Sequence, residues 1–151
     1  MSAFVEADRR LLGQVLNHIL PAGAGLPAGG ALGVVTYVEE AIGRDPTQRR
    51  LFLEGLGAIA ATCHARHGNA FEDAGERDQD DVLREVHSAR PDFFDALLVH
   101  AYSGYYSNPE IVRLLGLEVW PPQPRGHHLA PFDPSLLQIV KDRPPLYRPT
   151  P

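Results

Sequence analysis

Histidines and a single cysteine are the residues in this chain most suited to bind a metal. His64 and His67 stand three residues apart beside Cys63, and a second pair, His127 and His128, follows further along the chain. Imidazole nitrogen and thiolate sulfur are the ligands that zinc prefers, but two ligands on one helix do not complete a site. A small His-ligated metalloprotein is therefore one hypothesis, against the alternative that these histidines are solvated near the end of a helix.

The nearest approach to a nucleophilic catalyst is a serine one helical turn after a histidine. His100 and Ser103 could touch on one helix face. A catalytic base also needs an acid that orients it, and Asp95 would point to a different face. Six of the 19 acidic residues gather between Glu72 and Asp81, in a polar stretch that we expect to be exposed. The sequence therefore predicts no catalytic residue.

A glycine-rich segment matches the letters of a dinucleotide-binding fingerprint. Gly23, Gly25 and Ala28 have the required spacing. That motif works only between a strand and a helix, where the helix N-terminus meets the pyrophosphate. Here the apolar spacing predicts a helix before the segment, and Pro27 lies inside it. We expect an ordinary interhelical loop and no cofactor-binding residue in this chain.

Composition excludes several classes of protein. The chain has 151 residues, 44% of them hydrophobic, with a net charge of −5. These values fit one soluble globular domain and argue against nucleic acid, whose phosphates need clustered lysine and arginine. No apolar run approaches the roughly 20 residues of a membrane span, so we expect no direct insertion into a membrane. A lone cysteine forms no intrachain disulfide and fits a reducing compartment.

The beginning of the chain bears on localisation. Arg9 and Arg10 superficially resemble a twin-arginine export signal, which requires an uninterrupted apolar region after the arginines. Gln14, Asn17 and His18 interrupt that region here. We expect a cytoplasmic protein, and a periplasmic protein exported with a partner is the alternative.

The apolar spacing predicts an all-α fold, a compact bundle of about five to six helices over residues 1–117. The expected helices end at Pro21, run from Val34 to Gly43 and from Asp45 to about Gly68, form a short helix after Asp81, and then begin at Pro91 and at Pro109. In the second helix, Val34, Val35, Val38 and Ile42 should face inward, and Glu39 and Glu40 outward.

Residues 118–151 should form an extended proline-rich tail. Nine of these 34 residues are proline, which neither helices nor sheet interiors sustain. One turn of helix is expected between Ser135 and Val140. Because the tail is also rich in apolar residues, we expect it to pack on the helical body or on a partner.

Aromatic and proline residues supply the remaining functional signal. Tyrosine, tryptophan and arginine are the side chains that anchor protein interfaces most often. A partner interface is therefore predicted from a set in the fifth helix and the tail: Tyr102, Tyr105, Tyr106, Trp120, Pro121, Pro122 and Arg125. An intramolecular use, in which the tail covers the fifth helix, stays open. A stand-alone helical adaptor that binds through its proline-rich tail is another hypothesis.

Several segments, in order and at similar spacing, resemble the gluconate 2-dehydrogenase subunit 3 family. The first helix ends in a similar way before a small-residue loop, and the later helices carry similar motifs. The segments are Leu16–Gly23 (LNHILPAG), Ala31–Glu40 (ALGVVTYVEE), Phe52–Leu56 (FLEGL), Phe93–Leu98 (FFDALL), Gly104–Pro109 (GYYSNP), Gly116–Leu117 and Trp120–Pro122. Together they span most of residues 11–126.

The resemblance implies a non-catalytic, all-helical small subunit. Such a subunit wraps a larger FAD-dependent dehydrogenase of the glucose-methanol-choline (GMC) class, which oxidises a sugar or polyol, and it assists maturation of that partner. FAD is then expected in the partner and no cofactor in this chain. In many members the small subunit also carries its partner through the twin-arginine route. This sequence departs from the pattern of the exported members, because its first family-like helix starts almost at Met1. We therefore expect a cytoplasmic complex.

Overall fold

Helices make up most of the described part of the chain, and no strand occurs in it. The computed structural model describes residues 4–117, 133–141 and 143. The helices are α1 (Glu6–Ile19), α2 (Val34–Gly43), α3 (Pro46–His67), η1 (Phe71–Asp73), α4 (Glu76–Ala89), α5 (Pro91–Tyr106), α6 (Pro109–Leu114), η2 (Pro134–Leu137) and α7 (Gln138–Lys141). The predicted all-α fold is confirmed, as is the helical turn near residues 135–140. The rest of the predicted tail lies outside the described residues.

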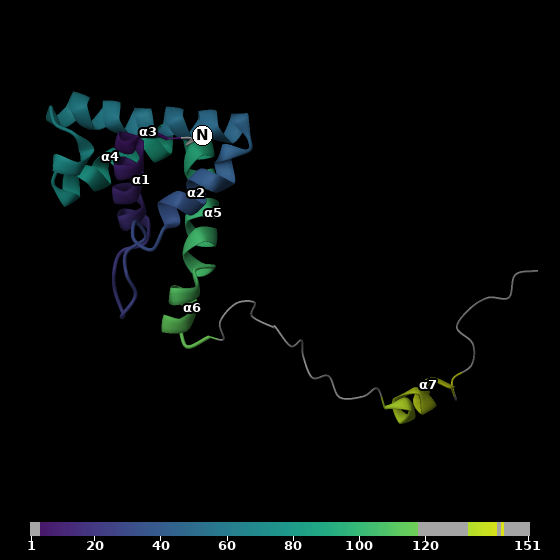
Figure 1. The fold of residues 1–151 in the computed structure, drawn as a ribbon. Helices are drawn as coiled ribbons and strands as arrows, with labels where there is room; N and C mark the ends of the chain where they lie inside the picture. The colour runs from purple at the N-terminus through teal and green to yellow at the C-terminus, as the bar shows by residue number, and fades with distance from the viewer. Residues whose placement is uncertain (1–3, 118–132, 142, 144–151) are drawn as a thin grey trace, which may run out of the picture.

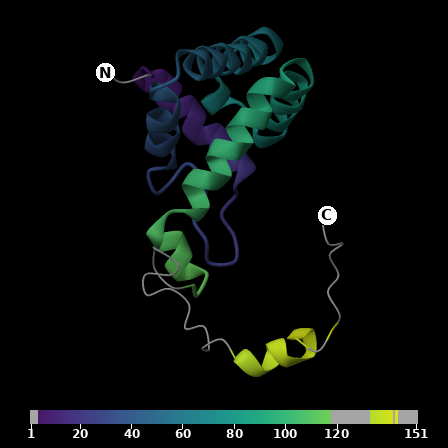
Figure 2. The same cartoon turned by 90° about the vertical axis from the view of Figure 1, so that its right-hand side faces the viewer.

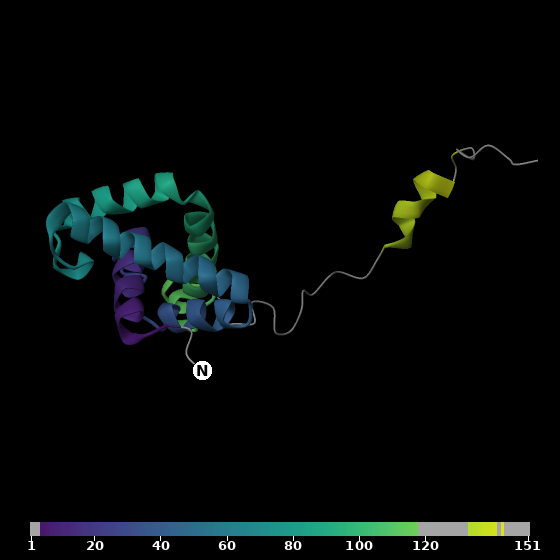
Figure 3. The ribbon, with the colours of Figure 1, turned by 90° about the horizontal axis from the view of Figure 1, so that it is seen from above.

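The long helix α3 organises the bundle. It runs across the top of the molecule in Figure 1, and α5 descends from it with α6 at its lower end. Figure 3, viewed from above, shows α3 between α4 on one side and α2 on the other, and α3 contacts both. Figure 2 shows the lower half of α5 and α6 projecting beyond the other helices, beside the loop that joins α1 to α2.

Local signals explain where α3 begins and ends. The Asp45 side chain accepts hydrogen bonds from the backbone N–H groups of Thr47 and Gln48, and Pro46 occupies the first helical position. Gly68 ends the helix at a φ of 74°, a left-handed conformation that glycine adopts without steric cost. Both boundaries agree with the sequence prediction.

The core lies where α3 meets α5. Phe52 of α3 packs edge-to-face on Phe93 of α5, with ring centroids 5.5 Å apart, and both are fully buried. Gly55, one turn after Phe52, allows this approach, because a Cβ atom there would overlap the Phe93 ring. The crossing therefore depends on a missing side chain as much as on the large ones.

The prediction for Glu39 was wrong. Glu40 faces outward as expected, but Glu39 is 6% exposed. Its carboxylate forms an ion pair with Arg9 of α1 and accepts a hydrogen bond of 3.2 Å from the backbone N–H of Phe4. Burial of a carboxylate is stable when it is paired and hydrogen-bonded, and these two contacts join residues 30 and 35 positions apart in the sequence.

The acidic stretch is less of a loop than the sequence suggested. α4 already begins at Glu76, so six of the ten residues from Glu72 to Asp81, which were predicted as an exposed loop, are α-helical. Acidic side chains in a first turn stabilise a helix N-terminus. Gln79 is buried and donates a hydrogen bond of 2.6 Å to the carbonyl oxygen of Phe71. His18 of α1 contacts the same place, with Nε2 2.7 Å from Gln79 Oε1 and Nδ1 3.0 Å from Asp80 Oδ1.

Candidate functional site

The large side chains of α5 form two columns with different surroundings. One column packs into the core and consists of Phe93, Phe94, Leu97, Ala101 and Tyr105. On the opposite side Tyr102 and Tyr106 are 44% and 47% exposed and lie nearly parallel, with ring centroids 6.1 Å apart. The structure therefore divides the predicted interface tyrosines between the interior and the surface.

Tyr105 serves the fold of the projecting region. It is 2% exposed, and its hydroxyl donates a hydrogen bond of 2.5 Å to the carbonyl oxygen of Pro27. Asn108 Nδ2 donates a second hydrogen bond, of 2.8 Å, to the carbonyl oxygen of Leu32. Both bonds fasten the loop between α1 and α2 to the α5–α6 junction, so this loop lies beside α5 in Figures 1 and 2. In the described structure Tyr105 is thus no part of the exposed surface.

Replacing Tyr105 by Phe is expected to lower the free energy of unfolding by about 1 kcal/mol, because the Pro27 carbonyl loses its donor. Burial, with a smaller effect of Tyr106, raises the pKa of the Tyr105 phenol. The folded state then holds this proton more tightly than the unfolded chain. The resulting stabilisation is complete below the ordinary tyrosine pKa of about 10 and is lost as the pH rises through the higher folded-state value.

Denaturant titrations at neutral pH and above about pH 10 measure the stability lost in Tyr105→Phe and the stability that the natural chain loses at high pH. Tyr102→Phe, at an exposed position, is the control and should change neither. A Tyr105→Phe variant as stable as the natural chain, with the same loss at high pH, would contradict this role.

The remaining predicted interface residues lie outside the described part of the chain. These are Trp120, Pro121, Pro122 and Arg125. The sequence analysis did not predict two further groups of exposed apolar side chains. Val99 is exposed on the same side of α5 as Tyr102 and Tyr106, and three leucines in or just after α6 are exposed as well. The helical spacing of Val99, Tyr102 and Tyr106 was the signal that could have found the first group. The exposed leucines are Leu114, Leu115 and Leu117.

The metal candidates do not converge in the described structure. His64 lies at a hollow of about 370 Å³ between α1 and α3, in largely apolar surroundings. His67 turns toward α4, where Nδ1 is 3.8 Å from Asp78 Oδ2. Within residues 4–117 and 133–141, no three His, Cys, Asp or Glu side chains are placed to hold a metal ion. His127 and His128 lie outside these ranges.

The nucleophile candidates are separated as well. His100 packs its ring against Phe52, with centroids 5.7 Å apart, and burial lowers its pKa. Ser103 and Asp95 are exposed, and among the described residues neither side chain forms a hydrogen bond with His100. Cys63 is fully buried, and burial, helped by nearby Asp78 and Glu72, raises the pKa of its thiol. A thiol in such surroundings is a poor nucleophile.

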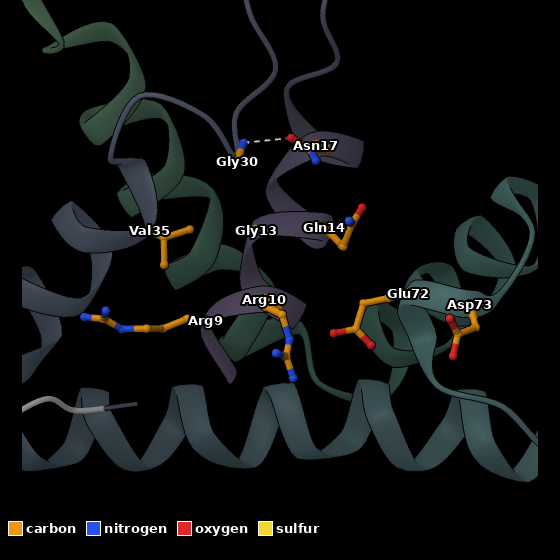
Figure 4. Close-up of a pocket in the computed structure, with 9 residues that line it drawn as sticks. All are labelled: Arg9, Arg10, Gly13, Gln14, Asn17, Gly30, Val35, Glu72 and Asp73. Atoms are coloured by element: carbon orange, nitrogen blue, oxygen red, sulfur yellow. Dashed lines mark hydrogen bonds between the residues drawn. The ribbon is translucent and has the colours of Figure 1, made fainter. Parts of the chain in front are cut away.

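A polar groove of about 560 Å³ runs along α1. Arg10 and Gln14 reach toward it from α1, and Glu72 of η1 lies across from Arg10 (Figure 4). Asn17 is used by the fold, because its Oδ1 accepts a hydrogen bond of 2.9 Å from the Gly30 backbone N–H. Guanidinium, amide and carboxylate groups face the same space, so the groove favours neither an anion nor a cation.

Comparison with known proteins gives one match. The family model for gluconate 2-dehydrogenase subunit 3 covers residues 6–121, from the start of α1 past the end of α6. The chain belongs to the gluconate 2-dehydrogenase subunit 3 family. The resemblance in the sequence motifs is thereby confirmed. No curated protein and no solved structure matches this member of the family.

Membership of this family makes the chain a subunit of a dehydrogenase complex. Another subunit of such a complex would bind to an exposed face of this chain, not within a pocket. The stacked Tyr102 and Tyr106 are the part of the predicted interface that the structure places at the surface. Among the described helices, none combines the length and apolar character needed to cross a membrane.

Proposed function

We propose that this member of the gluconate 2-dehydrogenase subunit 3 family is a non-catalytic small subunit. It binds, stabilises and helps to mature a larger FAD-dependent dehydrogenase of the GMC class that oxidises a sugar or polyol. The observation that carries the proposal is the family match over residues 6–121. The flavin of the partner would accept the hydride, and this chain would contribute binding surface.

The described side chains support a role in binding and not in catalysis. Ser103, His100 and Cys63, the candidates for nucleophilic chemistry, are dispersed between the surface and the core. The large exposed side chains of α5, in contrast, are of the kind that anchors interfaces. A subunit of this type stabilises its partner by binding the folded form and not the unfolded one.

Producing the flavoprotein subunit with and without this chain tests the proposal. We expect that omission of the chain strongly lowers the yield of folded flavoprotein, its FAD content and its dehydrogenase activity. Absorbance of bound flavin per mole of protein, together with activity per mole of flavin, separates loss of maturation from loss of turnover. Equal yield, FAD content and activity in the two preparations would refute the maturation role.

A further inference from the structure

From Val99 onward the outward side of α5 is largely apolar, whereas its first half carries the exposed Asp92 and Asp95. An apolar outward side is unusual for a helix whose other side is already in the core. Val99, Tyr102 and Tyr106 follow one another at helical spacing, on the side opposite the buried column. A helix at the surface normally carries charged or polar residues on its outer side, and a helix that is apolar all round is normally covered. In the part of the chain that the structure describes, this stripe of α5 is left exposed.

Exposed apolar side chains concentrate in this region. Of the ten large hydrophobic side chains exposed in the described residues, six lie between Val99 and Leu117 and are 43–63% exposed. α4 gives the contrast, because its outer side carries Asp81, Arg84 and Glu85, with an Arg84–Asp81 ion pair of 2.8 Å. We name Val99, Tyr102, Tyr106, Leu114, Leu115 and Leu117 the α5–α6 face.

The side chains of the α5–α6 face favour another protein as the partner that binds there. Between Val99 and Leu117 the chain carries one acidic and one basic side chain, Glu110 and Arg113, so this segment has no net positive charge to attract an anionic membrane surface or a nucleic acid. The two stacked tyrosines offer flat, rigid contact area with hydroxyl groups at the edge, which suits an apolar protein surface. The family match includes the whole face and assigns the chain to a complex with another subunit.

We infer that the α5–α6 face is where the flavoprotein subunit docks, with Tyr102 and Tyr106 at the centre of the contact. This inference rests on the proposed function for the existence of that partner. The loop fastened by Tyr105 and Asn108 supports the face from behind, since both hydrogen bonds hold the α5–α6 junction in place. The partner surface that fits is an apolar recess able to receive aromatic rings.

Binding of purified flavoprotein subunit to full-length variants tests the inference. Tyr102→Ser and Tyr106→Ser should each weaken binding roughly 30-fold or more, as for side chains at the centre of an interface. Val5→Ser and Leu53→Ser remove exposed apolar side chains elsewhere, at 67% and 38% exposure, and should change the affinity less than about threefold. The inference would be overturned if the tyrosine and the control substitutions lowered the affinity equally, or if the tyrosine substitutions left it unchanged.

A charge-introducing variant and a chemical probe keep the test decisive if a serine variant folds poorly. Val99→Arg adds a charge at a side chain that is 63% exposed, so it should abolish binding while the helical circular dichroism stays unchanged. Nitration of Tyr102 and Tyr106 in the natural chain should proceed in the isolated monomer and be blocked by the flavoprotein. Protection in the isolated monomer would mean that the tail covers the face, and protection only in a dimer would mean that a second copy does. Either result would overturn the inference.

Two kinds of failure can be distinguished. If the natural chain binds no flavoprotein at all, the proposed function fails. If it binds, but the tyrosine and Val99 variants bind equally well, the function stands and only the α5–α6 face is wrong.

Discussion

Gly55→Ala is expected to cost about 3 kcal/mol or more of unfolding free energy and to lower the melting temperature by roughly 10 °C. A methyl group at this position would lie inside the van der Waals envelope of the Phe93 ring. Phe93 has nowhere to move, because it is fully buried and packs edge-to-face against Phe52 and Phe94. Interiors packed to this density accommodate an added group only by straining side chains or shifting helices.

Gly57→Ala is the matched control, two residues along the same helix. A Cβ atom at Gly57 meets nothing within 4 Å, so alanine should leave stability unchanged or raise it by up to about 1 kcal/mol through helix propensity. Thermal and denaturant unfolding of the two variants give the comparison. Equal stability of the two variants would show that α3 and α5 do not cross as closely as described.

Glu39→Ala is expected to cost about 2 kcal/mol, an effect confined largely to the attachment of the N-terminal segment. The substitution leaves the Phe4 N–H without this acceptor and the Arg9 guanidinium without its carboxylate. Arg9 is 39% exposed along its side chain, so water recovers part of the loss. Hydrogen exchange of the backbone amides around Phe4 should become faster, together with a lower denaturation midpoint.

The neighbouring Glu40→Ala supplies the control for this pair. Glu40 is exposed, and surface substitutions of this kind usually stay within about 0.5 kcal/mol. If Glu39→Ala were as mild as Glu40→Ala, the buried ion pair between α1 and α2 would contribute little to the fold.

Most of the helical architecture could be predicted from the sequence. Asp45 followed by Pro46, and Gly68 at the far end, set the bounds of α3 through local capping, which needs no knowledge of the tertiary fold. Pro91 opened α5 for the same reason. Such signals act within a few residues and are therefore visible in the chain itself.

The sequence predictions that were wrong concern residues whose partners come from other elements of the fold. Glu39 was expected outside because carboxylates are rarely buried, and only its pairing with Arg9 from another helix reverses that preference. Likewise, α4 gained a turn within the acidic stretch because Gln79 found partners in Phe71 and His18. Helical periodicity assigns a residue to a face, but it does not reveal a partner tens of residues away.

The same limit applies to the candidate interface. The spacing of Tyr102 and Tyr106 places them on one side of a helix, yet nothing local tells whether that side is inside or outside. Tyr105, one position away, lies on the buried side of α5, and its hydroxyl donates a hydrogen bond to Pro27 in the loop between α1 and α2. Only the packed structure distinguishes the buried Tyr105, which holds the loop between α1 and α2, from the exposed Tyr102 and Tyr106.

Affinity purification of the tagged full-length chain from its native host, with the eluate examined for flavin absorbance and subunit ratio, is the most direct test of the proposed function. The proposed function predicts a yellow eluate in which a larger FAD-containing dehydrogenase accompanies the chain in near-equimolar amount and oxidises a sugar or polyol. A colourless eluate that contains the chain alone, at low salt and with the tag at either end, would contradict it.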